Sequence, residues 1–235
     1  MIKIGILGCA EIAFSRFLPA LMENKESECV CIAEEYDKSK LEQFEKEFGI
    51  KSAESFQSII EDENIDAVYI PLPPALHFPY AKAALEHGKH VFVEKPSTIS
   101  YEQTSELVEL ARKKNLVLQE NYMFQFHAQL KEIENLIASG ELGKLRLVRT
   151  SFGFPRRAEG DFRYVKELGG GTMMDNGGYT IKLIDMLLGE SMRLVSSQLD
   201  YDEKTGIDIF GTAEFVNDDG VIALSLIHIS EPTRH

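Results

Sequence analysis

Short apolar runs alternate, in the first half of the chain, with longer segments in which apolar residues recur about every 3.6 positions. The runs predict strands, and the periodic segments predict helices. Strands that alternate with helices across short turns predict a doubly wound parallel sheet with helices on both faces. The predicted strands are Ile2–Leu7, Cys29–Ala33, Ala67–Ile70, Val91–Val93 and Leu116–Gln119, and the predicted helices are Glu11–Asn24, Lys38–Phe48, Leu76–Glu86 and Ser100–Lys114.

The pattern changes after Asn121, where several strand-like runs follow one another. Turn signals such as Asn217–Gly220 separate these runs, which predicts a second α/β domain with a largely antiparallel sheet. We therefore expect domains over residues 1–120 and 121–223. The predicted strands are 145–154, 194–199, 207–216 and 221–227, and the predicted helices are 127–139 and 172–188.

Charge and composition exclude several classes of protein. The formal charge of −13 argues against a nucleic-acid partner, because phosphate binding needs clustered lysine and arginine. The longest uncharged stretch, Ala67–Ala81, is short and rich in proline, so we expect no membrane helix. Three cysteines are too few for a disulfide scaffold, which favours a reducing, cytoplasmic setting.

The turn after the first predicted strand has the features of a phosphate-binding turn. Gly8 permits a tight turn, the small Ala10 lets a pyrophosphate approach, and the helix that begins at Glu11 and Ile12 offers backbone N–H groups. The motif is a variant, since alanine replaces the second and third glycine of G-x-G-x-x-G. A turn that needs small residues only for packing is the alternative.

Two acidic residues, Glu34 and Glu35, follow the second predicted strand. A carboxylate at this place hydrogen-bonds the adenosine ribose hydroxyls and repels a 2′-phosphate, so the sequence favours NAD and leaves NADP as the alternative. Both glutamates could instead be solvent-facing charges.

More candidate residues lie at the carboxyl ends of the third and fourth predicted strands, where doubly wound sheets bind ligands. Leu72 and His77 follow the third strand, and Glu94 and Lys95 end the fourth. Lys95 could instead be a surface charge with Glu94 as its partner. We expect no metal site, because His87 and His90 have no convincing third ligand.

A glycine-rich segment, Gly169–Tyr179, leads into the helix of the second half. Asp175 and Tyr179 are four positions apart and share a helical face. Gly177 and Gly178 lie between them, at a cost of about 1 kcal/mol each relative to alanine. Something therefore approaches this helix closely, either a packed segment of protein or a ligand ring.

These segments together resemble the Gfo/Idh/MocA family of oxidoreductases, named after glucose–fructose oxidoreductase and inositol dehydrogenase. The resemblance spans residues 1 to about 223, and its most specific element is Glu94-Lys95-Pro96 after Gly88-Lys89-His90. It implies a Rossmann domain followed by an α/β domain, with the active site between them. The other matching segments are Gly8–Ala13, His77, Asn121–Phe126 and Gly169–Tyr179.

The resemblance also implies roles for individual residues. Lys95 matches the family's catalytic lysine, Asp175 its substrate-site aspartate, and Tyr179 stands where many relatives have histidine. Pro74 departs from a frequent asparagine. A tyrosine with an unperturbed pKa of about 10 is a poor base unless a nearby cation lowers that value, and Lys95 supplies a cation.

The expected function is therefore hydride transfer between a nicotinamide and a sugar-like alcohol or ketone, such as a cyclic polyol, a keto-sugar or a nucleotide sugar. The alternatives are a trans-dihydrodiol dehydrogenase, which shares the same residues, and a non-catalytic dinucleotide-binding sensor or subunit. The resemblance further implies a homo-oligomer. Loop residues that could contact the substrate are Phe154, Arg156, Arg157 and Arg163. The arginines would suit a phosphate or carboxylate group of the substrate, or they could be surface charges.

The end of the sequence departs from this pattern. Residues 224–234 resemble the translation of a sequencing-library adapter, so we expect residues 224–235 to be a non-native tail. We also expect the second domain to be truncated, with residues 229–235 having no helix or partner strand.

Overall fold

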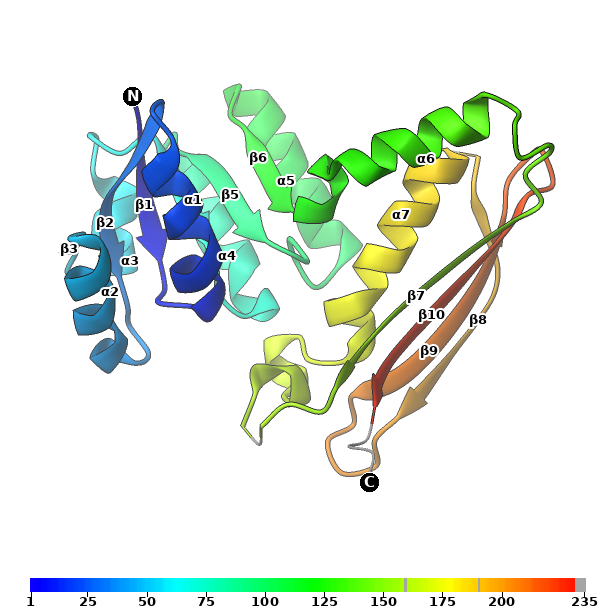
Figure 1. The fold of residues 1–235 in the computed structure, drawn as a ribbon. Coiled ribbons are helices and arrows are strands. Elements are labelled where there is room, and N and C mark those ends of the chain that lie inside the picture. The colour runs from blue at the N-terminus through cyan, green and yellow to red at the C-terminus, as the bar shows by residue number, and fades with distance from the viewer. Residues whose placement is uncertain (159, 190, 231–235) are drawn as a thin grey trace. The chain divides into compact units, whose positions relative to one another are not determined.

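A computed structural model describes residues 1–158, 160–189 and 191–230 (Figure 1). The chain divides into two compact units, Met1–Asn121 and a second that begins at Tyr122. Within the described ranges, no helix is long and apolar enough to cross a membrane.

The first unit contains a parallel six-stranded sheet, as the alternation of strands and helices predicts. Its strand order, β3-β2-β1-β4-β5-β6, is that of a dinucleotide-binding doubly wound sheet. The strands are β1 (Ile2–Leu7), β2 (Ser27–Ala33), β3 (Lys51–Ser52), β4 (Ala67–Ile70), β5 (His90–Glu94) and β6 (Leu118–Asn121).

Helices cover both faces of this sheet because side chains alternate along each strand. Ile6, Ile32 and Tyr69 pack against α1 and α2, whereas Leu7 and Val68 belong to the core under α3, α4 and α5. The helical segments are η1 (Ala13–Phe17), α1 (Leu18–Glu23), η2 (Lys38–Lys40), α2 (Leu41–Phe48), α3 (Phe56–Glu61), α4 (Pro74–Glu86) and α5 (Tyr101–Lys114).

Three features of the first unit differ from the sequence prediction. The short strand β3 and the six-residue helix α3 were not predicted. β6 begins two residues later than expected, at Leu118, and extends through Asn121. Ala13–Phe17 is a π-helical turn within the first predicted helix.

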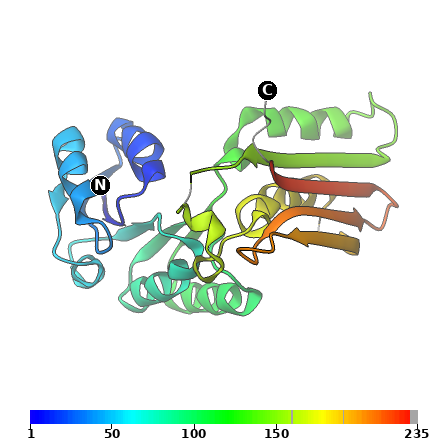
Figure 2. The ribbon, with the colours of Figure 1, turned by 90° about the horizontal axis from the view of Figure 1, so that it is seen from below.

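The second unit is built on a four-stranded sheet in the order β7-β10-β9-β8 (Figure 2). β10 pairs antiparallel with β9 and parallel with β7, so the sheet is largely antiparallel, as predicted. The elements are η3 (Met123–Phe126), α6 (Ala128–Ala138), β7 (Leu147–Pro155), η4 (Phe162–Tyr164), η5 (Lys166–Leu168), η6 (Met173–Gly177), α7 (Gly178–Leu188), β8 (Arg193–Tyr201), β9 (Asp208–Val216) and β10 (Ile222–Ser230).

One face of this sheet is covered by α7, which lies beside the strands in Figure 1. Ile184 and Leu188 of α7 pack against Val148, Phe215 and Ala223 from three strands. This core fixes the direction of α7, whose first turn carries Tyr179 and which directly follows η6, the turn that carries Asp175.

The expectation that residues from Ile229 onward have no partner strand is wrong for the described part of the segment. Ile229 pairs with Phe154 and Ser230 with Pro155, because β10 continues along the full length of β7. Residues 231–235 lie outside the described residues. The non-native origin of 224–235 stays a prediction.

Candidate active site

The predicted phosphate-binding turn lies where β1 and β2 end. Gly8 has φ +113°, a conformation that L side chains rarely adopt. A Cβ at this position would lie 2.7 Å from Leu72 Cδ2, so Leu72 packs directly on the turn. Gly8, Leu72 and Glu34 come from three different strand ends and meet at this edge of the sheet.

The helix that follows begins at Ala10, whose carbonyl accepts the N–H groups of Ala13 and Phe14. The N–H groups of the first helical turn have no acceptor within the helix, so they are available to an anion. Gly8, the small Ala10 and the helix start at Glu11 and Ile12 therefore fit a dinucleotide pyrophosphate.

Glu34 is not the solvent-facing charge of the alternative interpretation, because only 7% of its surface is exposed. Its carboxylate accepts the N–H groups of Cys9 at 2.7 Å, Tyr36 at 2.8 Å and Asp37 at 3.3 Å. These bonds hold Glu34 against the phosphate-binding turn. Glu35 has another role, since it accepts the N–H of Phe56 at the start of α3.

His77 is fully buried, and both of its ring nitrogens lie against backbone carbonyls. Nδ1 is 2.7 Å from the Pro96 oxygen and Nε2 is 2.6 Å from the Leu72 oxygen. Burial lowers the pKa of His77. The ring therefore connects the turn after β4 to the turn after β5, and a contact of His77 with the cofactor stays a prediction.

Glu94, at the end of β5, is also buried and is held from two neighbouring strands. Its Oε1 accepts the Tyr69 hydroxyl at 2.6 Å and the Asn121 amide at 2.5 Å. Burial, together with Glu94, raises the pKa of Tyr69, which keeps this hydroxyl a donor.

Lys95 lies on the turn between these anchored neighbours. Glu94 precedes it, the Pro96 carbonyl contacts His77, and the Ser97 N–H donates to Glu120 at 2.6 Å. The backbone that carries Lys95 is thus fixed by side chains from α4, β4 and β6. Such support is what a precisely placed functional side chain requires.

In the second unit, two of the three consecutive glycines, Gly170 and Gly171, pack against the backbone of Arg163. Gly171 donates its N–H to the Arg163 carbonyl at 2.9 Å, and a Cβ on Gly170 would lie 2.6 Å from the same oxygen. A Cβ on Gly171 would overlap the carboxylate of Asp208, a residue of β9. Asp208 in turn accepts the Met173 N–H at 2.5 Å and so binds the start of the helical segment.

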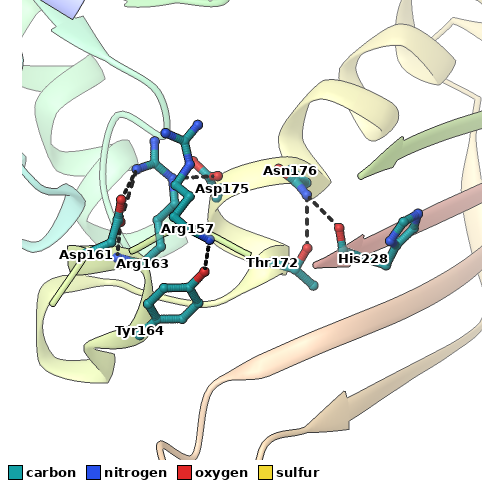
Figure 3. A network of polar contacts seen from close by, with 8 residues as sticks. All are labelled: Arg157, Asp161, Arg163, Tyr164, Thr172, Asp175, Asn176 and His228. Carbon is teal, nitrogen blue, oxygen red and sulfur yellow. Dashed lines mark hydrogen bonds and ion pairs between the residues drawn. The ribbon is translucent and has the colours of Figure 1, made fainter. Parts of the chain in front are cut away.

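Asp175 lies within the π-helical turn η6, and its carboxylate is bound by an arginine (Figure 3). Arg163 Nε donates to Asp175 Oδ2 at 2.8 Å, and Nη1 of the same guanidinium lies 3.2 Å from Asp161 Oδ1. Arg163 therefore does not have the free surface position in which a substrate phosphate would meet it.

Tyr179 lies in the first turn of α7 with aromatic rings around it. Its ring centroid is 5.2 Å from Tyr122, 5.7 Å from Phe124 and 5.0 Å from Phe152. A Cβ on Gly178 would overlap the Tyr122 hydroxyl, and one on Gly177 would lie 2.7 Å from Met173 Sδ. Packing of protein side chains thus explains both helical glycines.

The close fit between Gly171 and Asp208 leads to a stability prediction. We expect Gly171→Ala to lower the free energy of unfolding by about 2–4 kcal/mol, because it combines backbone strain with displacement of a buried carboxylate. Urea unfolding of the variant and the parent protein measures this difference.

Gly206→Ala is the matched control, because Gly206 has φ +67° with nothing within 4 Å of its would-be Cβ. It should cost only about 1–2 kcal/mol from the backbone. Equal losses in the two variants would contradict the role given to Asp208.

Two other kinds of site, a metal site and a reactive thiol, have little support among the described residues. No group of three or more histidine, cysteine, aspartate or glutamate residues there could hold a metal ion. His90 Nδ1 accepts the Val117 N–H at 2.9 Å and so joins β5 to the residue just before β6. Burial raises the pKa of Cys9 to about 12, which makes its thiol a poor nucleophile.

Some residues at these sites were not found from sequence. Asp208, Tyr122 and the pairing of Arg163 with Asp175 depend on contacts between separate elements. A local signal existed only for Tyr122, which belongs to the matching segment Asn121–Phe126.

Comparison with known proteins agrees with this arrangement. Residues 2–122 match the model of an oxidoreductase family with an NAD-binding Rossmann fold, and residues 130–233 match the Gfo/Idh/MocA C-terminal domain. A dTDP-3,4-didehydro-2,6-dideoxy-alpha-D-glucose 3-reductase of Streptomyces violaceoruber is 38% identical over 90% of this chain and 62% of its own. This chain thus spans less than two thirds of that relative's length.

A solved structure is also similar throughout the chain. It is a 3-ketoreductase from Actinomadura kijaniata in complex with NADP and TDP-benzene, 34% identical with a TM-score of 0.93, covering 97% of this chain and 70% of that chain. A trans-1,2-dihydrobenzene-1,2-diol dehydrogenase of Xenopus laevis is 30% identical over 67% of this chain and 48% of its own. With both family models matched, the chain belongs to the Gfo/Idh/MocA family of oxidoreductases.

Proposed function

We propose that the protein is an NAD(P)-dependent oxidoreductase that interconverts a ketone and a secondary alcohol on a nucleotide-linked sugar. One observation carries this proposal. Solved variants of the Actinomadura 3-ketoreductase replace a lysine in one case and a tyrosine in another. The number of residues between these two positions in the sequence equals the number between Lys95 and Tyr179 here.

The reaction needs a hydride and a proton. A bound nicotinamide would supply or accept the hydride. Tyr179 would donate a proton to the carbonyl oxygen in the reductive direction, and Lys95 would stabilise the negative charge that develops there. Asp175 would accept a hydrogen bond from a substrate hydroxyl. The turn from Gly8 to Ile12, with Glu34, would hold the cofactor.

The segment before Asp175 supports a substrate with a phosphate group. Arg156 and Arg157 are exposed, and their guanidinium carbons lie 5.4 Å from the Tyr164 ring centroid and 5.3 Å from that of Phe154. Guanidinium groups bind phosphates in a fork geometry, and aromatic rings can stack on a nucleobase. The arginines would bind the diphosphate of a nucleoside diphosphate, and the rings would stack on its base.

An assay with matched substrates tests the proposal. Oxidation of NADH and of NADPH is followed with a dTDP-linked 3-keto-sugar and with the same sugar lacking the nucleotide. Reduction of NAD⁺ and of NADP⁺ is followed with an aromatic trans-diol. We expect the highest kcat/KM for the nucleotide-linked compound. Cofactor binding with no turnover of any compound would instead favour the sensor or subunit interpretation.

A diol dehydrogenase is the second candidate, favoured by the similarity to the Xenopus enzyme. The proposed roles of Lys95, Asp175 and Tyr179 are the same in both cases. Turnover of the aromatic diol, with none of the nucleotide sugar, would select this candidate.

We further propose that NAD is preferred over NADP, although the Actinomadura enzyme is seen with NADP. The support is the Glu34 carboxylate, which would repel a 2′-phosphate. We expect Glu34→Gln to lower the ratio of kcat/KM with NAD to that with NADP at least about tenfold, a change of about 1.4 kcal/mol.

Glu35→Gln is the control for this change, because it removes an equal charge from the next residue and keeps an oxygen for the Phe56 N–H. Its cofactor ratio should stay within about twofold of the parent, given the screening of an exposed charge. A parent protein that already prefers NADP would refute the preference.

Self-association is the last part of the proposal. Side chains on the sheet face opposite α7, including Leu147, Phe210 and Ile222, are large, apolar and exposed. Burial of such a face in a homo-oligomer would remove it from water. Light scattering coupled to size-exclusion chromatography measures the mass and would show a single chain if this is wrong.

We also propose a cytoplasmic setting. Cys9, Cys29 and Cys31 are all free thiols, which persist in a reducing compartment. Fractionation of cells that express the protein tests this location.

A further inference from the structure

Arg163 has an unusually well-fixed position for an arginine in a loop segment. Asp161 accepts the Arg163 N–H at 3.0 Å and also lies 3.2 Å from its Nη1, so one carboxylate holds both ends of the residue. The guanidinium carbon lies 4.5 Å from the Phe162 ring centroid. Two residues of the same short segment, Asp161 and Phe162, therefore hold the side chain in addition to its bond with Asp175.

The main chain of Arg163 is fixed as well. Its carbonyl accepts the Gly171 N–H at 2.9 Å, and Gly170 packs so closely that a Cβ would lie 2.6 Å from the same oxygen. Gly171 lies at the start of the segment that carries Asp175. Backbone and side chain thus connect Arg163 to the same helical segment at two separate points.

The charges in this cluster are complementary. Burial disfavours the charged form of Arg163, but Asp175 and Asp161 outweigh it and raise the pKa of Arg163 above its ordinary value. The side chains of Arg163 and Asp175 are 18% and 12% exposed, so water screens their bond only partly. The chain provides a permanently charged partner for the carboxylate of Asp175 (Figure 3).

We propose that Arg163 is a positioning residue that holds the Asp175 carboxylate in one orientation for the reaction. It acts through Asp175 and not through contact with substrate. The inference rests on the proposed function, because it takes Asp175 to be a substrate-site residue. It assigns Arg163 a different role from Arg156 and Arg157, which we place at the phosphate of the substrate.

A double-mutant cycle tests this role. The four proteins are the parent, Arg163→Gln, Asp175→Asn and the double variant, each assayed for kcat and KM with the preferred substrate. We expect Arg163→Gln to lower kcat/KM about tenfold to a hundredfold, the range for a charge-assisted hydrogen bond. The double variant should be no less active than Asp175→Asn, since Arg163 then has no carboxylate to hold.

Two further variants sharpen the test. Arg163→Lys keeps the positive charge but loses the rigid set of guanidinium N–H donors. It should therefore recover part of the kcat/KM that Arg163→Gln loses. Arg149→Gln removes an exposed arginine from β7 and should leave kcat/KM within about twofold of the parent. Losses that multiply in the double variant would show direct contact with substrate and overturn the proposal.

The melting temperatures of the same four proteins, measured without substrate, form a second double-mutant cycle. The shifts of the two single variants should not add, because each one breaks the same ion pair. Additive shifts would overturn the pairing itself. Absence of turnover in the parent protein would count against the proposed function. The melting temperatures would still test the ion pair, because they need no substrate.

Discussion

Replacing Tyr179 by phenylalanine is expected to lower turnover at least about a hundredfold, the lower end for general acid–base catalysis. The variant removes only the hydroxyl that would exchange a proton with substrate. The ring remains among Tyr122, Phe124 and Phe152, so the fold should be unaffected. Steady-state kinetics give kcat, and quenching of cofactor fluorescence shows whether the dissociation constant of the cofactor is unchanged.

Tyr201→Phe is the control, because it makes the same change at an exposed tyrosine of β8. Turnover of this variant should match that of the parent. If Tyr179→Phe also kept near-normal turnover, another group would have to supply the proton.

Lys95→Met should lower turnover by a similar factor or more, at least about a hundredfold. Methionine retains most of the length of the side chain but removes the charge that would stabilise the carbonyl oxygen. The turn should persist, because His77 and Glu120 hold it through the backbone of Pro96 and Ser97. Stopped-flow measurement of a single turnover detects the loss in the chemical step.

Lys113→Met, at an exposed position of α5, controls for the loss of a positive charge and should retain parental turnover. Near-normal turnover in both Lys95→Met and Tyr179→Phe would refute the assignment of the catalytic pair.

The order of strands and helices in the first unit could be predicted because each element carries its own periodic signal. Helix α5, for example, begins at the N-cap Ser100 and ends at Asn115, and both ends follow from local chemistry. Helix α3 is too short for periodicity to show. Its only local signal is the capping box formed by Ser55 and Ser58, and buried Phe56 and Ile60 stabilise the helix through tertiary packing.

The candidate site was predictable to the extent that single residues carry its chemistry. Lys95, Asp175 and Tyr179 stand out by residue type and by spacing along the chain. Their supports do not, because such contacts join distant positions. Asp208 binds Met173 across 35 residues, and Asn121 binds Glu94 across 27.

A contact of His77 also joins residues that are distant in sequence. A histidine near the end of a strand predicts a ligand contact, but the sequence does not predict that its two ring nitrogens lie on the carbonyls of Leu72 and Pro96. Only the fold reveals that these two turns are neighbours. Burial then decides that the ring connects protein segments.

The place of β10 between β7 and β9 has a consequence for the order of events during synthesis. A ribosome releases β7 well before Ile222–Ser230, and until then β7 lacks the strand with which it pairs. Pairing of β7 with β10 closes a long loop, which is slow compared with forming a hairpin. The parallel sheet of the first unit can assemble while the second is still open, and β7 would spend that interval as an unprotected strand edge exposed to chaperones or to aggregation.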